Sequence, residues 1–467
     1  MSALFLLGLL GCTDGPPPPP DVLVVVLDTV RADKLSAYGA ERPTSQQLTA
    51  IAEAGVQFED VTTSGTWTWP SHAALFTGKP PWETGAHWSS ASSTVDEATG
   101  YWTMAPLRSD IPTIAERFAS AGYRTVSLAS NSLLDPKLGL TRGFEEAAWL
   151  KRDPTVVASA QDAIREEDGR PLFLFVNLMA AHAPYSVVPE VPWSARHAEP
   201  MRDPERAAWL KTYGADRDPP ALALSLRPGP EALTGEEAFA KGTLELSEAD
   251  LRLVADLYDG ELIRLDKALM TLVDTWNKAG RGGGIVAVTS DHGEYLGEHG
   301  LIGHGIRTLT EVTHVPMVIA APGRLEAGKR VETPVQLMDL APTLLDLAGV
   351  EPNATGSLRT VVDGAARPGP ILSRAWPMPV FSKNVGGDYV HGQRLLREGD
   401  KAVVVRDDGL VQGFSMRDDR GMTTPLDEDL SAWAVRAMAA MPDDASTGSL
   451  EIPAEALEHL KALGYMQ

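Results

Sequence analysis

Short apolar runs alternate with helical patterns along most of the chain, and this alternation constrains the fold more than any other feature. Uninterrupted runs of this kind are expected for strands that are buried on both faces of a sheet. The clearest are Val22 to Leu27, Thr125 to Ala129, Leu172 to Leu178, Ile285 to Thr289 and Val315 to Ala320. Helical periods lie between them, over Thr44 to Ala54, Ile111 to Ala121 and Tyr258 to Trp276. The sequence therefore predicts an α/β fold with a mostly parallel sheet flanked by helices.

The 467 residues can be divided where this alternation of apolar runs and helical patterns is lost. Residues 21–350 carry it and are expected to form one large domain. Within them, 186–250 are rich in Pro, Trp, Arg and acidic residues, which favours an insertion over the site. Residues 351–467 begin Pro- and Gly-rich and then offer short strand and helix patterns, which predict a smaller C-terminal α+β subdomain. Its expected elements are a strand at Ala402 to Val405 and helices at Leu426 to Met441 and Pro453 to Leu463.

Cys12 is the single cysteine of the chain and follows an apolar segment. Residues 3–10 are too short to span about 30 Å of hydrocarbon. Their ending, Leu9-Leu10-Gly11-Cys12, resembles a bacterial lipobox. That resemblance implies a signal peptide over 1–11, a lipidated Cys12, and a stiff proline-rich tether over 12–20. The implied localisation is the cell envelope, anchored on the periplasmic side in the outer membrane. An unlipidated, frayed apolar start is the alternative, since no Lys or Arg precedes the run.

Composition excludes several classes of protein. With 41 Lys and Arg against 63 Asp and Glu, the formal net charge is −22. This argues against nucleic acid as a partner, because phosphate backbones need clustered cations. One cysteine excludes a disulfide framework and a cysteine-rich zinc site. An anionic substrate would need local positive charge, most simply a metal ion.

Polar residues end the predicted strands, where ligands bind in open parallel sheets. Each one alone has an ordinary structural explanation, as a helix cap or a hydrogen-bonded imidazole. Together they supply the oxygen and imidazole ligands that a divalent ion needs. They are Asp28, Asn131, His182, Asp291 and His292.

A loop between the first two of these strands enters a helix and contains Thr68 two residues before Pro70. Proline suits a first helical turn. A hydroxyl at that place faces unpaired N–H groups and the positive end of the helix dipole, which favour an incoming anion. In isolation Thr68 would be a plain N-cap.

Taken in order, these segments resemble the sulfatase family of the alkaline phosphatase superfamily, over residues 21–350. The motifs that carry the resemblance are Val26-Leu27-Asp28-Thr29, Thr68-Trp69-Pro70-Ser71-His72, His182-Ala183-Pro184-Tyr185 and Ser290-Asp291-His292-Gly293-Glu294. The resemblance implies an alkaline-phosphatase-like fold and one metal ion held by Asp28, Thr68, Asp291 and His292. It places Thr68 as the nucleophile, His182 and His304 as catalytic residues, and His72 and Asn131 against the substrate.

The chain departs from typical sulfatases at three positions. Thr68 replaces the cysteine or serine that is oxidised to formylglycine, and threonine cannot form that aldehyde. Thr29 and His292 stand where relatives have Asp and Asn, so the all-oxygen cage that suits calcium is lost, which favours zinc or manganese. His72 replaces an arginine, which removes one fixed positive charge.

The expected function is a metal-dependent hydrolase of sulfate or phosphate esters, with phosphodiesters or phosphonate monoesters favoured. The expected substrate is an anionic small molecule, lipid head group or glycan. Three alternatives stay open: a sulfatase that uses unmodified threonine, a head-group phosphotransferase, and a catalytically silent surface-binding protein.

Overall fold

The computed structural model describes residues 18–88, 104–202, 221–222, 224, 233–442, 453 and 455. The predicted signal peptide over 1–11, Cys12 and the first part of the tether lie outside these residues, and so does the predicted helix at Pro453 to Leu463 apart from residues 453 and 455. No helix among the described residues is both long and apolar enough to cross a membrane.

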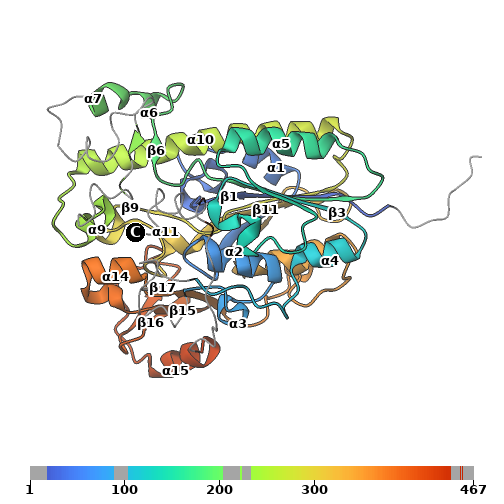
Figure 1. The fold of residues 1–467 in the computed structure, drawn as a ribbon. Helices are drawn as coiled ribbons and strands as arrows, with labels where there is room; N and C mark the ends of the chain where they lie inside the picture. Colours follow the sequence, from blue (N-terminus) through green and yellow to red (C-terminus); the bar gives the residue numbers. More distant parts are fainter. Residues whose placement is uncertain are drawn as a thin grey trace, which may run out of the picture.

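A nine-stranded sheet is the centre of the described structure (Figure 1). Its order is β12-β2-β11-β8-β1-β5-β3-β4, with β13 beside β2. All pairs are parallel except those of β11, which runs antiparallel to β2 and β8. The strands are β1 (Val22–Leu27), β2 (Val56–Thr62), β3 (Arg124–Ala129), β4 (Glu146–Trp149), β5 (Leu172–Leu178), β8 (Ile285–Thr289), β11 (His314–Ala320), β12 (Lys329–Val331) and β13 (Val335–Gln336).

Helices cover both faces of this sheet, as the continuous apolar strands require. Successive side chains of β1 point to opposite faces. Leu23, Val25 and Leu27 pack in one apolar cluster with α1 (Gln46–Glu53), α5 (Asp153–Arg165) and α10 (Glu248–Lys278). Val22, Val24 and Val26 pack in a second cluster with α2 (Thr68–Thr77), α4 (Ile114–Ser120) and α12 (Leu340–Leu347). Figure 1 shows the two layers on either side of the sheet. The predicted α/β class is confirmed.

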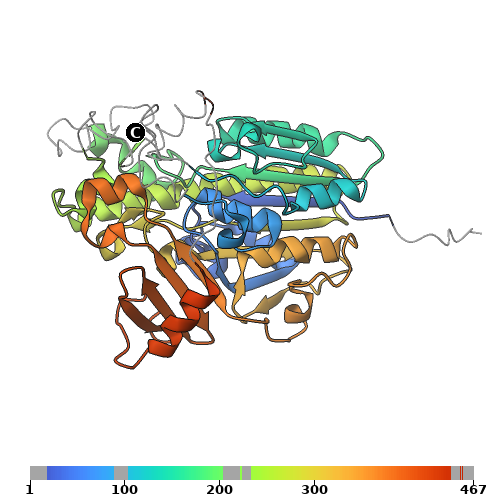
Figure 2. The same ribbon diagram turned by 60° about the horizontal axis from the view of Figure 1, so that its bottom comes forward.

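The C-terminal region forms a second, antiparallel sheet of four strands, with α15 (Ser431–Ala440) packed on it. The strands are β14 (Ile371–Ala375), β15 (Gln393–Glu398), β16 (Lys401–Arg406) and β17 (Val411–Ser415). Figure 2 shows this sheet beside the central one. The two are joined at the loop before α2, where the Arg374 N–H donates to the Ser64 carbonyl at 3.1 Å. The smaller α+β subdomain is therefore present, and its helix begins at Ser431 rather than Leu426.

The predicted insertion at 186–250 is described in parts. The described parts contain only short elements. Strand β6 (Tyr185–Ser186) pairs with β7 (Ala221–Leu222). The short helices here are α6 (Pro192–Ala195), α7 (Ala198–Arg202) and α9 (Gly235–Ala240). Helix α10 begins at Glu248, ten residues before the predicted Tyr258. A capping box explains this start, because Ser247 and Asp250 exchange side-chain and backbone hydrogen bonds. Helix α9 contacts β10 (Ile302–Gly303) and so lies beside the loop that carries His304.

Candidate active site

The candidate site lies at the carboxyl ends of four neighbouring strands, β8, β1, β5 and β3. Because these strands are parallel, the residues that end them meet at one edge of the sheet. Asp291 comes two residues after β8, and Asp28 directly follows β1. Asn177 is the penultimate residue of β5, and Asn131 follows β3. The sequence-predicted residues Asp28, Asn131 and Asp291 are thus brought together.

Asp28, Asp291 and His292 form a possible metal-binding group. One ligand atom from each lies within 4.8 Å of the others, and all three side chains are buried. Burial, and then the charge of Asp28, raise the pKa of Asp291 well above its ordinary value. Burial lowers the pKa of His292, so its imidazole is neutral and suited to bind a metal.

The hydrogen bonds of the two carboxylates fit a cation between them. Asp28 Oδ2 accepts bonds from Asn131 Nδ2 at 2.8 Å and Asn177 Nδ2 at 3.0 Å. Asp291 Oδ1 accepts from the backbone N–H groups of Thr29 at 3.2 Å and His292 at 2.9 Å. The second oxygen of each, Asp28 Oδ1 and Asp291 Oδ2, has no hydrogen-bond partner among the described residues. Buried carboxylate oxygens in that state are expected to bind a cation.

Thr29 has a strained backbone conformation, and its turn positions Asp28 and Asp291. Its φ of 59° is left-handed, which is costly for a β-branched residue. Three contacts fix the strained turn: the Thr29 N–H bond to Asp291, the Val30 N–H bond to Ser290 Oγ at 2.9 Å, and the Tyr258 hydroxyl bond to the Thr29 carbonyl at 2.8 Å. The turn after β1 is thereby locked to the turn after β8.

Thr68 lies beside the metal-binding group as the first residue of α2, with Trp67 as the N-cap. This corrects the simple N-cap alternative, which placed Thr68 just ahead of the helix. Its Oγ1 lies 3.2 Å from Asn131 Nδ2 and 3.4 Å from His292 Nε2. The side chain is fully buried. The hydroxyl, the two carboxylates and Asn131 therefore form one continuous cluster.

Four histidines gather around this cluster: His72, His182, His292 and His304. The ring centroid of His304 lies 4.4 Å from that of His292 and 5.1 Å from that of His182. His72, one helical turn after Thr68, donates from Nδ1 to the Thr68 carbonyl at 3.0 Å, and its Nε2 has no partner among the described residues. Burial lowers the pKa of His72 to about 4, and burial also lowers that of His182. All the sequence-predicted site residues that the structure describes thus lie in one place.

Two residues of the site were not predicted from the sequence as site residues. Asn177 shares Asp28 Oδ2 with Asn131, and Glu294 accepts a bond from His304 Nδ1 at 2.8 Å. A polar residue inside an otherwise apolar strand is the signal that could have found Asn177, because such a side chain needs a buried partner.

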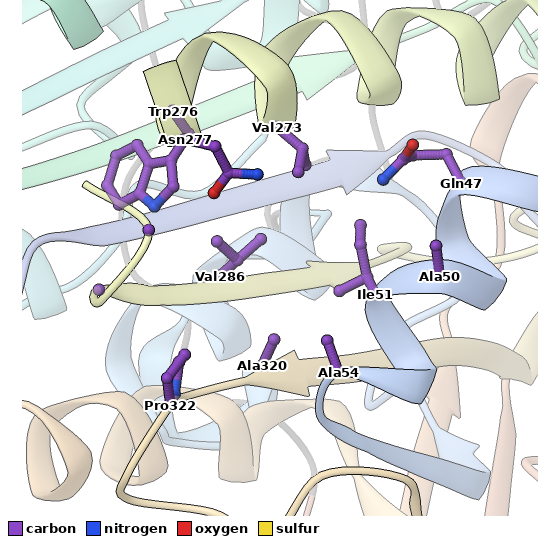
Figure 3. Close-up of a pocket in the computed structure, with 12 residues that line it drawn as sticks. Gln47, Ala50, Ile51, Ala54, Val273, Trp276, Asn277, Val286, Ala320 and Pro322 are labelled. Carbon is purple, nitrogen blue, oxygen red and sulfur yellow. The ribbon is translucent and has the colours of Figure 1, made fainter. Parts of the chain in front are cut away.

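A cavity of about 270 Å³ lies away from this site (Figure 3). It opens between α10 and α1, at the amino end of β8, and Trp276, Val273 and Ile51 line it. Among the described residues its lining is mainly apolar and contains no titratable side chain. The chemistry is therefore expected at the opposite edge of the sheet.

Comparisons with known proteins identify the family to which this chain belongs. A family model described as Sulfatase matches residues 20–350. A Delta 4,5-hexuronate-2-O-sulfatase of Bacteroides thetaiotaomicron is 24% identical over 365 residues, which cover 74% of this chain and 71% of that protein. The phosphonate monoester hydrolase of Agrobacterium radiobacter aligns with a TM-score of 0.63 at 19% identity, over 90% of this chain and 94% of its own.

A further structure is that of another protein in complex with its substrate, D-glucosamine-2-N,6-O-disulfate. It aligns with a TM-score of 0.66 at 17% identity, over 95% of this chain and 98% of its own. That protein therefore binds a doubly sulfated sugar. The family model covers well over half of the chain and includes every strand of the central sheet. This protein is a member of the sulfatase family of metal-dependent hydrolases.

Proposed function

We propose that this sulfatase-family hydrolase uses Thr68 as its nucleophile and acts on phosphodiesters or phosphonate monoesters. The observation that carries the proposal is the position of Thr68 Oγ1, within 3.4 Å of His292 Nε2 and 3.2 Å of Asn131 Nδ2. A hydroxyl at the start of a helix, beside a cation site, is well placed to attack an electrophilic centre.

Asp28, Asp291 and His292, with Thr68, would hold one divalent ion. When bound, such an ion lowers the pKa of a hydroxyl and offsets negative charge on the transferring group. The imidazole among oxygen ligands favours zinc or manganese over calcium.

The reaction proceeds in two displacements at phosphorus. Thr68 Oγ1, deprotonated to the alkoxide, forms the new O–P bond while the ester oxygen leaves and takes a proton from an imidazolium, either His182 or His304. Water then attacks the phosphothreonine, the same imidazole takes a proton from that water, and the O–P bond to Thr68 breaks. The enzyme returns to its starting state with one ester bond hydrolysed.

The chemistry of threonine favours phosphorus over sulfur. A formylglycine hydrate can expel sulfate as its aldehyde re-forms, so water does not have to attack sulfur. Thr68 has no such exit, and its sulfate ester would have to be displaced at sulfur. A phosphothreonine has the in-line route that phosphoryl transfer uses.

The neutral state of the His72 imidazole supports a substrate with one negative charge. With its pKa lowered to about 4 by burial, His72 is neutral at neutral pH. Typical sulfatases place a permanent arginine cation here. A phosphodiester or phosphonate monoester carries one negative charge, whereas a phosphomonoester carries nearly two. The structural likeness to a phosphonate monoester hydrolase is in keeping with this choice. The proposal also retains the lipid anchor at Cys12, which would place the site in the cell envelope.

The test compares kcat/KM for matched 4-nitrophenyl sulfate, phosphate, phosphodiester and phosphonate substrates. The phosphodiester or phosphonate should be the best of the four. Thr68→Val, which replaces the hydroxyl with a methyl group of similar shape, should lower kcat by about 10³-fold or more. Mass spectrometry should find the covalent adduct on Thr68.

Thr66→Val is a matched control, because Thr66 is also buried in the same loop and its Oγ1 has no hydrogen-bond partner among the described residues. It should keep wild-type activity. A better rate with the sulfate ester would instead support a sulfatase with unmodified threonine, and full activity in Thr68→Val would exclude Thr68 as the nucleophile.

A further inference from the structure

Asn177 is a polar residue on an otherwise apolar face of β5. Alternate residues of a strand point to opposite faces of the sheet, so Asn177 shares its face with Phe173 and Phe175. Both phenylalanines pack in the apolar cluster that includes α2. The Asn177 side chain is fully buried there. A buried amide is costly unless its hydrogen bonds are made, so the partners of Asn177 decide what this residue does.

The register of the central sheet places Asn177 between two turns of the site. Asn177 is aligned with Val26 of β1 on one side and with Ala129 of β3 on the other. Asp28 comes two residues after the first of these, and Asn131 comes two residues after the second. One side chain at position 177 can therefore reach both turns.

The Asn177 amide makes one hydrogen bond to each turn. Its Nδ2 donates to Asp28 Oδ2 at 3.0 Å, and its Oδ1 accepts from the Asn131 backbone N–H at 3.2 Å. These partners settle the orientation of the amide, because a carboxylate oxygen accepts and a backbone N–H donates. The amide turned by 180° would lose both bonds. Asn177 thus ties the turn after β1 to the turn after β3.

The side chain of Asn131 completes this arrangement. Its Oδ1 accepts from the Leu133 N–H at 2.9 Å, which directs its Nδ2 towards Asp28 Oδ2 at 2.8 Å. The same Nδ2 lies 3.2 Å from Thr68 Oγ1. Among the described residues, the amides of Asn131 and Asn177 are the only donors to Asp28 Oδ2. Asp28 Oδ1 is therefore the oxygen that is left for a cation.

We infer that Asn177 is a positioning residue for the cation site. It holds Asp28 by Oδ2 so that Oδ1 stays available to the ion, and it fixes the turn that carries Asn131. Asn177 acts through these two residues and is not itself a ligand. Partners of this kind set metal affinity, because they hold a ligand in its binding orientation before the ion arrives. The inference rests on the proposed function, which assigns Asp28 to the ion.

Asn177→Leu tests the inference, because leucine has a similar branched shape and suits the apolar face but can neither donate nor accept a hydrogen bond. We expect the Kd for zinc to rise by about 10- to 100-fold, measured on the full chain by competition with a chelator of known affinity. Asn177→Ser has a polar side chain that is too short to reach both turns. It should show a loss of the same size. The measurement contains no ester, so it does not depend on which substrate the enzyme prefers.

Phe173→Leu is the matched control. Phe173 lies on the same face of β5, and its ring packs against Phe118 and Phe144 rather than against the site. The substitution should lower Tm, as followed by circular dichroism, because it removes buried apolar contacts. It should leave the zinc Kd within about twofold of the wild-type value, because the two positions share no partner.

Two results would overturn the inference: an unchanged zinc Kd in both Asn177 variants, or an equal loss of zinc affinity in Phe173→Leu. The second result would mean that metal affinity follows the general stability of the fold. A wild-type protein that binds no zinc would overturn the cation site together with this inference. A preference for the sulfate ester in the kinetic comparison would contradict the proposed substrate alone, and a raised zinc Kd in the Asn177 variants would still support the positioning role.

Discussion

Asp28 and Asp291 each bind the protein through one carboxylate oxygen and leave the other for a ligand. Two buried carboxylates repel each other, and desolvation adds to the cost. A divalent ion removes both costs, so its binding should stabilise the fold. We expect one equivalent of zinc or manganese in the purified protein, measured by elemental analysis. Removal of the metal by a chelator should lower Tm, and adding the metal back should restore it.

Two substitutions sharpen this prediction. Asp28→Asn should reduce the metal content to less than about a tenth of an equivalent, because the loss of one ligand charge weakens a site of this size. His292→Asn replaces the imidazole with an oxygen ligand and should shift the preference from zinc towards calcium. Asp33→Asn is the control, since Asp33 is 54% exposed and pairs with Arg31. Calcium alone in the active wild-type protein would contradict the choice of metal.

Among the single residues of the site, the sequence predicts those whose position follows from where a strand ends. Asp28, Asn131, Asp291 and His292 could be found in this way, because parallel strands bring their carboxyl ends together. Glu294 could not, since its role depends on the distance to a loop ten residues away. The strain at Thr29 was also hidden, because nothing in the residue type suggests a left-handed φ.

Among the elements, the strands with continuous apolar runs were predicted almost to the residue, and β2 was missed. Its sequence, Val-Gln-Phe-Glu-Asp-Val-Thr, contains polar residues that are nevertheless buried in the structure. Gln57 Nε2 donates to the Ala37 carbonyl at 2.9 Å, and Asp60 pairs with Arg397. These partners come from distant segments, so the local pattern reads as polar.

Helix α10 makes a contact that should render stability dependent on pH. Its Glu261 carboxylate accepts a bond from the Ser186 N–H at 2.9 Å, four residues after His182, and pairs with Arg264 at 2.8 Å. Burial raises the pKa of Glu261 from 4.5 to about 7. The fold therefore favours the neutral acid. Protonated Glu261 therefore contributes to the free energy of unfolding. This contribution is complete below about pH 4.5 and is lost as pH rises through about 7, and it amounts to about 3 kcal/mol at most.

Glu261→Gln tests this, because the amide resembles the neutral acid at every pH. The Tm of the variant relative to wild type should rise between pH 5 and pH 8, as followed by circular dichroism. Glu326→Gln, at an exposed position, should show no such trend. A constant difference between Glu261→Gln and wild type across this range would show that Glu261 does not titrate there.

Across the whole molecule, a buried ion pair joins the C-terminal sheet to the central one. Arg397 of β15 donates two bonds to Asp60 of β2, at 2.8 and 2.7 Å, and both side chains are less than 10% exposed. Arg420 adds a third bond to Asp60 at 2.8 Å. Burial by itself would raise the pKa of Asp60, but the two arginines outweigh it and lower that pKa. The subdomain that supports the Thr68 loop through Arg374 is thus held by charge as well as by apolar packing.

Removing the arginine of the buried Asp60–Arg397 pair should lower the free energy of unfolding more than removing the arginine of an exposed pair. The exposed pair chosen for comparison is Glu59–Arg330, because Glu59 lies on the same strand, β2, as Asp60. Arg397→Met leaves Asp60 buried with only the half-exposed Arg420, and we expect a loss of about 3–5 kcal/mol in urea unfolding. Arg330→Met removes the pair with Glu59, whose arginine is 62% exposed, and should cost at most about 1 kcal/mol. The double variant Asp60→Leu, Arg397→Met should lose less than Arg397→Met alone, because the one charge that then lacks its Asp60 partner, Arg420, is half-exposed and can be hydrated. Equal losses for Arg397→Met and Arg330→Met would mean that apolar contacts alone hold the two sheets together.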